Sequence, residues 1–135
     1  MRELGTTAGE VHTDLGANHH MWTYASVWEN DWVTARTRTA SFTWFGGYVG
    51  TVATVIVDSN NQLVGVTDQL SYGVNGTLFG GSDRTETWNQ LMRRTGPGTV
   101  PARILVAHGW RFEARSVVKM VEAFKTVAPF IPLLV

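Results

Sequence analysis

The chain has no cysteine, only four prolines and no net charge. Without cysteine, a disulfide framework, a thiolate metal site and a cysteine nucleophile are all excluded. Eleven basic and eleven acidic side chains balance without a run of one sign, so the charged surface expected of a nucleic-acid-binding protein is missing. We therefore expect no nucleic-acid partner, and a stability that comes from packing.

Long apolar runs are also missing. No stretch approaches the roughly 18 consecutive apolar residues of a membrane span, and the first ten residues lack the apolar core of a signal peptide. The sequence predicts no membrane span and, by default, a cytoplasmic protein. Export stays open, because a mature secreted chain that begins with an added methionine would look the same.

What the sequence does have is a nearly unbroken series of β-branched and aromatic residues over 32–88, divided by Gly- and Asn-rich corners. Such side chains pack well in strands, and the corner residues let the chain reverse. The clearest hairpin joins 48–57 to 62–72, and a long strand is expected over 32–45. The predicted fold is mainly β: an antiparallel β-barrel or a strongly curved β-sandwich of about seven or eight strands.

The 135 residues suit a single domain with its own hydrophobic core. Residues 1–18 are polar and Gly-rich, which predicts a loosely ordered arm or an edge strand, and 19–135 form the β domain. Apolar residues at three- and four-residue steps predict one C-terminal α-helix over about 117–128 that covers part of the sheet. The apolar tail at 129–135 must be buried in this subunit or in another, which leaves a homo-oligomer open.

Several predicted strands carry bulky aromatic and charged side chains on alternate positions, and hence on one face. If these faces line the inside of a small barrel, they form an apolar cavity with a few polar groups, as small-molecule pockets do. Non-covalent binding of a small organic ligand is therefore the leading functional prediction. A core that is merely rich in tryptophan is the alternative, and a register slip of one residue would move the charges into water. The predicted ligand-binding residues are His20, Trp22, Tyr24, Arg36, Arg38, Trp44, Trp88 and Trp110.

Catalysis in the same cavity is the second prediction. Glu86 or His108 could act as the general acid-base of a cofactor-independent isomerase, cyclase or hydratase. Alternatively, Glu86 only pairs with Arg36 or Arg38 across neighbouring strands. We expect no cofactor in either case.

A metal site of His12, His20 and His108 is conceivable, but no recognised ligand spacing supports it, so no metal is predicted. Two further classes stay open. Aromatic rings on a flat surface could stack on sugar rings in a carbohydrate-binding module; the candidates are Trp28, Trp32, Trp44 or Tyr48, with Asn60, Asn61, Gln62, Asp83 or Asn89 as the hydrogen-bonding rim. The apolar tail could instead serve a structural oligomer.

Overall fold

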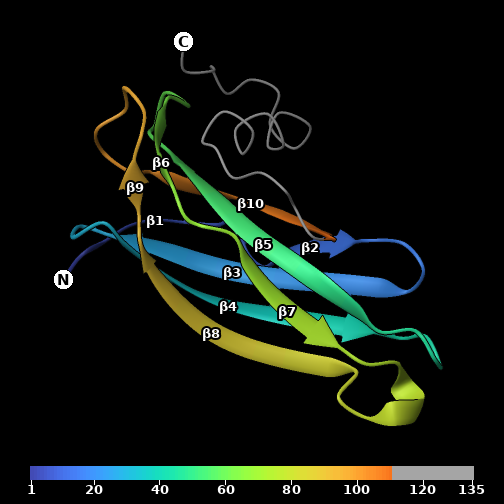
Figure 1. Ribbon diagram of the computed structural model, residues 1–135. Coiled ribbons are helices and arrows are strands. Elements are labelled where there is room, and N and C mark those ends of the chain that lie inside the picture. The colour runs from blue at the N-terminus through green and yellow to red at the C-terminus, as the bar shows by residue number, and fades with distance from the viewer. Residues whose placement is uncertain (111–135) are drawn as a thin grey trace.

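The computed structural model describes residues 1–110. The helix predicted over 117–128 and the tail at 129–135 lie outside the described residues. Within residues 1–110 no helix is long and apolar enough to cross a membrane. The elements in chain order (Figure 1) are β1 (Glu3–Thr6), β2 (Val11–Asp14), β3 (His19–Trp28), β4 (Trp32–Ser41), β5 (Tyr48–Val57), β6 (Leu63–Val66), β7 (Leu70–Val74), the 3-10 turn η1 (Thr77–Phe79), β8 (Asp83–Leu91), β9 (Arg93–Arg94) and β10 (Arg103–Trp110).

All the strands belong to one sheet that curls into a half-barrel. Its order is β8-β4-β3-β1-β10-β5-β6-β9, with β2 also paired to β3 and β7 also paired to β5. The pairs are antiparallel except β1 with β10. The predicted mainly β fold is confirmed. The sheet has ten strands instead of seven or eight, in part because residues 1–18 contribute β1 and β2.

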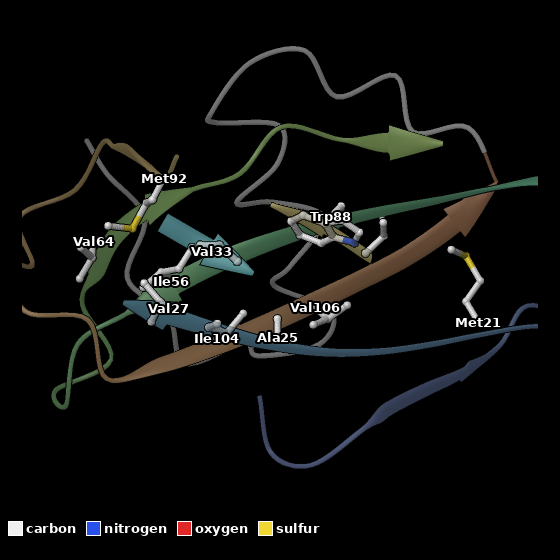
Figure 2. Packing of buried hydrophobic residues seen from close by; sticks show 11 residues of the cluster. Met21, Ala25, Val27, Val33, Ile56, Val64, Trp88, Met92, Ile104 and Val106 are labelled. Carbon is white, nitrogen blue, oxygen red and sulfur yellow. The ribbon is translucent and has the colours of Figure 1, made fainter. Parts of the chain in front are cut away.

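The inside of the curl is filled by a hydrophobic cluster from both halves of the sheet (Figure 2). β5 is the most deeply placed strand: nine of its ten residues are buried, so a run of Val, Thr and Ile fits it better than a polar alternation would. Most side chains of the cluster are aliphatic and interlock across the curl. Its members are Met21, Ala25, Val27, Val33, Val52, Ile56, Val64, Trp88, Met92, Ile104 and Val106.

The predicted hairpin at 48–57 and 62–72 is confirmed, although its second arm is divided into β6 and β7, which both pair with β5. In the turn, Oδ1 of Asp58 accepts hydrogen bonds from the backbone nitrogens of Asn60 and Gln62. Asn61 adopts a positive φ of 62°, which asparagine tolerates better than most residues.

The strand predicted over 32–45 is too long, because β4 ends at Ser41. Beyond it, the hydroxyls of Ser41 and Thr43 both donate to the carbonyl oxygen of Gly46 and close a tight loop. Residues 42–47 therefore form a loop at the end of the half-barrel, and this loop holds aromatic side chains outside the sheet.

Side chains connect β7 and the residues just before it to β8 and to the start of β9. The amide of Gln90 accepts a hydrogen bond from the backbone nitrogen of Asp68 (2.8 Å) and donates one to its carbonyl oxygen (3.3 Å), much as a neighbouring strand would. Arg93 forms an ion pair with the Asp68 carboxylate, and Nη1 of Arg84 donates to the carbonyl oxygen of Gly73. These contacts, the β7–β8 seam, help to hold the half-barrel in its curled shape.

Candidate functional site

The predicted ligand-binding residues are divided between the two faces of the sheet. On β3 the odd positions point inward, and Met21 and Thr23 are fully buried. The even positions of β3 and β4 lie on the outer face, where Trp22 is opposite Arg38 and Tyr24 is opposite Arg36. The predicted site residues on this outer face are His20, Trp22, Tyr24, Arg36 and Arg38.

The register of β8 places Trp88 on the other face. Trp88 is opposite Ala35, and Thr87 is opposite Arg36, so Thr87 points outward with Arg36 while Trp88 points into the core. Trp88 is 8% exposed and donates from Nε1 to Oγ1 of Thr37. The sequence-based grouping of Trp88 with the even residues of β3 and β4 therefore does not match the structure.

Glu86 lies near the β7–β8 seam, opposite Thr37. Its carboxylate accepts a hydrogen bond from Nε of Arg84 (2.8 Å). Arg38 instead forms a bidentate pair with Asp83, with distances of 2.9 and 2.6 Å, and its guanidinium stacks over Trp22 at 4.3 Å. Within residues 1–110, Glu86 therefore pairs with Arg84 on its own strand, and not with Arg36 or Arg38 as the predicted alternative had it.

His108 is buried in a chain of polar groups that runs through the inside of the half-barrel. Its Nε2 lies 2.7 Å from Oγ1 of Thr23, which lies 2.8 Å from Oγ1 of Thr37, the acceptor of the Trp88 indole. Its Nδ1 lies 2.9 Å from Oγ1 of Thr13. Burial, and to a lesser degree the charge of His12, lowers the pKa of His108 to about 4, so the ring is neutral near pH 7.

The structure does not bring Glu86 and His108 together. Between β8 and the His108 ring lie Thr37 of β4 and Thr23 of β3, both fully buried. Both nitrogens of His108 are already engaged by threonine hydroxyls. A general acid-base needs hydrogen-bond reach to the atom that it protonates or deprotonates. The geometry thus favours a structural role for this network over shared acid-base chemistry.

The two remaining predicted residues lie at the end of the half-barrel. Trp44 is in the 42–47 loop and is 61% exposed. Trp110, at the end of β10, donates from Nε1 to the carbonyl oxygen of Leu15, and its ring lies 4.6 Å from that of His19. His19 is buried between Trp110 and Tyr48, and burial lowers its pKa.

Of the three histidines considered as metal ligands, two are neighbours and the third lies on the opposite face. Nε2 of His12 is 2.9 Å from Nδ1 of His20, and both rings stack with Trp22. His108 faces inward through Thr23. Within residues 1–110 no group of three or more His, Cys, Asp or Glu side chains is arranged to hold a metal ion.

The outer face of β3, β4 and β8 carries three open depressions that share lining residues. Arg36 lines both the largest, with a volume of about 500 Å³, and a second of about 240 Å³, while Thr34 lines both the largest and a third of about 300 Å³. We call this continuous surface the outer groove. The largest depression is lined by Tyr24, Ser26, Thr34, Ala35, Arg36, Thr87, Trp88 and Asn89; the second adds Glu10, Arg38 and Thr85; the third adds Met1, Trp28, Asn30 and Trp32.

Arg36 has an unusual position among the arginines around it. Arg38, Arg84, Arg93 and Arg94 each form an ion pair, whereas within residues 1–110 the guanidinium of Arg36 has neither an ion pair nor a hydrogen bond. In the outer groove, the N–H donors of the Arg36 guanidinium thus have no partner within residues 1–110 and lie between polar and aromatic side chains.

Sequence reasoning found Tyr24 and Arg36 but did not place Ser26, Thr34 and Thr87 in a site with them. The alternation of β3 and β4 indicates the first two, because they share the parity of Tyr24 and Arg36. Thr87 could not be found in this way, since its face depends on the pairing of β4 with β8.

Comparison of the chain with protein-family models, curated proteins and solved structures finds no match.

Proposed function

We propose that the protein binds an organic ligand non-covalently in the outer groove. The observation that supports this most directly is the guanidinium of Arg36, which has no ion pair or hydrogen bond within residues 1–110 and lines two adjoining depressions. A surface arginine without a partner remains free to donate to a ligand, whereas a paired one would first have to give up its carboxylate. Tyr24, directly opposite Arg36 and 42% exposed, offers a ring beside it.

The chemistry of the groove favours an acidic sugar chain. A guanidinium recognises a carboxylate with two parallel hydrogen bonds, and an aromatic ring packs against the apolar face of a sugar. The side chains of Thr34, Thr87 and Asn89 can bond to hydroxyl groups around the ring. An open groove suits an elongated ligand better than one that must be enclosed, and the aromatic pair Trp28 and Trp32 at one end is available to a second sugar unit. The inferred ligand is an oligosaccharide with uronic acid units.

The test is a calorimetric titration with tetragalacturonate, compared with the neutral cellotetraose. The proposal expects tighter binding of the acidic chain, and an affinity about tenfold lower or worse in Arg36→Gln, since loss of a charge-assisted pair removes on the order of 1.5–3 kcal/mol. Arg93→Gln is the matched control, because Arg93 is paired at the β7–β8 seam and does not line the groove. It should bind as the unmodified protein does.

Equal affinity in Arg36→Gln, or no preference for the acidic chain, would contradict the proposal. Native mass spectrometry of the gently purified protein provides an independent measurement: a discrete extra mass that is lost on denaturation would identify a copurified ligand. The acid-base alternative is tested by Glu86→Gln. A binding protein keeps most of its affinity for tetragalacturonate in this variant, while an enzyme that depends on Glu86 loses turnover.

A further inference from the structure

Two neighbouring loops expose five large apolar side chains at one end of the half-barrel. The loops are the 42–47 loop between β4 and β5 and the segment of η1 between β7 and β8, seen together at the lower right of Figure 1. Phe42 lies beside the ring of His20. The exposed fractions of the other four are 61% for Trp44, 68% for Phe45, 47% for Leu78 and 65% for Phe79. We call these four residues the loop tip. Scattered single apolar residues are normal on a surface, but a group of this kind marks an interaction site.

The two loops are bound to each other through their backbones. The backbone nitrogens of Thr77 and Leu78 donate to the carbonyl oxygens of Thr43 (2.8 Å) and Trp44 (2.9 Å). The rings of Phe45 and Phe79 meet across the loops, with centroids 6.4 Å apart. These contacts fix the two loops relative to each other, so the exposure of the four side chains of the loop tip follows from the fold.

Further hydrogen bonds satisfy backbone groups at this end of the molecule, which lowers the cost of moving it onto a surface with little water. The backbone nitrogen of Asn75 donates to the carbonyl oxygen of Gly81, and that of Phe79 donates to the carbonyl oxygen of Gly76. A backbone group that enters an apolar medium without a partner carries a large free-energy cost, and these groups already have partners. No charged side chain occurs over 39–57 or 69–82, so none has to be desolvated with the loops.

We propose that the loop tip docks the protein onto a lipid surface, with its four side chains inserted among the headgroups and upper acyl chains of a zwitterionic bilayer. Tryptophan and phenylalanine are favoured at this depth, where the medium is part apolar and part wet. A neutral tip gives no reason to require anionic lipid. A second copy of the chain is the weaker occupant, because stable protein interfaces use about 20–30 residues from each side and this tip offers four.

Flotation with vesicles of pure phosphatidylcholine tests the proposal. The full chain is expected to float with the vesicles, and Trp44→Ser combined with Phe79→Ser is expected to reduce the partition coefficient at least about tenfold, since binding follows the apolar area inserted. The matched control is Leu91→Ser combined with Val100→Ser. Leu91 and Val100 are also exposed, at 55% and 61%, but lie away from the loop tip, so this variant should bind normally.

A second measurement reports the depth of insertion. Brominated phosphatidylcholine should quench part of the tryptophan emission of the bound protein, and Trp44→Phe should keep binding but lose that part. Circular dichroism and thermal melting must first establish that each variant is folded. We expect folded variants, because substitutions of exposed side chains usually change stability little. The proposal is overturned if the full chain fails to float, if the two double variants bind equally, or if equilibrium sedimentation finds a dimer that only Trp44→Ser with Phe79→Ser disrupts.

Discussion

Nε2 of His108 lies 2.7 Å from Oγ1 of Thr23 inside the half-barrel, where His108 is only 8% exposed. With the ring neutral, all the donors along this chain can point the same way: Trp88 to Thr37, Thr37 to Thr23, and Thr23 to Nε2. The Nδ1 proton is then left for Thr13. Protonation of Nε2 would reverse the demand on Thr23 and place a charge in the core. This is why burial holds the pKa of His108 down to about 4.

The first prediction is that the protein loses stability as the pH falls from 6.5 to about 4. In this window the unfolded chain binds a proton at His108, whose ordinary pKa is 6.5, while the folded protein does not, so the free energy of unfolding decreases with falling pH. The difference between the two pKa values corresponds to a loss of up to about 3 kcal/mol. Urea denaturation at pH 7.0, 5.5 and 4.5 measures it.

His108→Asn is the test variant for this pH dependence. It is less stable at pH 7 because it disrupts the network, but its free energy of unfolding should change less between pH 7 and 4.5. Some dependence should persist, since burial also lowers the pKa of His19. An unchanged slope in His108→Asn would assign the acid sensitivity to other groups.

The second prediction compares two threonines that each accept an indole hydrogen bond. Oγ1 of Thr37 accepts from Trp88 inside the curl, and Oγ1 of Thr34 accepts from Trp28 on the outer face. Thr37→Val leaves the buried indole N–H of Trp88 without an acceptor and should cost about 1–3 kcal/mol of unfolding free energy. Water can replace the hydroxyl in Thr34→Val, which should cost under about 0.5 kcal/mol. Chemical denaturation of both variants measures the difference, and equal costs would contradict the role given to the buried bond.

Alternation within single strands was predictable, but the relation between strands was not. On β3 the sequence correctly groups Trp22 with Tyr24 on one face, because side chains alternate with period two. Whether Trp88 joins them depends on the register between β4 and β8, where Ala35 and not Arg36 is opposite Trp88. That register is set by the packing of the whole sheet, so the sequence alone wrongly grouped Trp88, which points inward, with the outer-face residues of β3 and β4.

Short polar strands were the second limit. Residues 1–18 read as a loose arm or an edge strand, because β1 and β2 are four residues each and carry few apolar side chains. β1 nevertheless lies between β3 and β10, and β2 brings His12 beside His20. Neighbouring strands supply the context that a four-residue polar segment lacks on its own.

The third prediction concerns the β7–β8 seam. Gln90→Ala removes both hydrogen bonds between the side-chain amide and the backbone of Asp68. The amide proton of Asp68 should then exchange faster with solvent, and the free energy of unfolding should fall by about 1 kcal/mol. Hydrogen exchange followed by NMR measures this locally. Asn89→Ala, the neighbouring residue on the outer face, serves as control, and a faster exchange at Asp68 in that variant too would exclude a specific contact by Gln90.

The fourth prediction concerns the approach of the two loops at Gly76. A Cβ atom added there would lie 2.5 Å from the carbonyl carbon of Phe45 and 2.8 Å from the carbonyl oxygen of Trp44, so Gly76→Ala must push the loops apart. At Gly73 the nearest atom would be 3.8 Å away, an ordinary contact, which makes Gly73→Ala the matched control. Gly76→Ala should lower the unfolding free energy by about 1–3 kcal/mol, as overpacking against backbone does.

Local effects separate this contact from a general loss of stability. In Gly76→Ala the amide protons of Thr77 and Leu78 should lose protection, because their acceptors are Thr43 and Trp44 on the other loop. Protection within β5 should fall by no more than the loss of global unfolding free energy, since that strand is held by β10 and by β6 and β7. If the two loops act as one braced unit in docking, Gly76→Ala should also float less efficiently with phosphatidylcholine vesicles than Gly73→Ala, even though neither variant changes an inserted side chain.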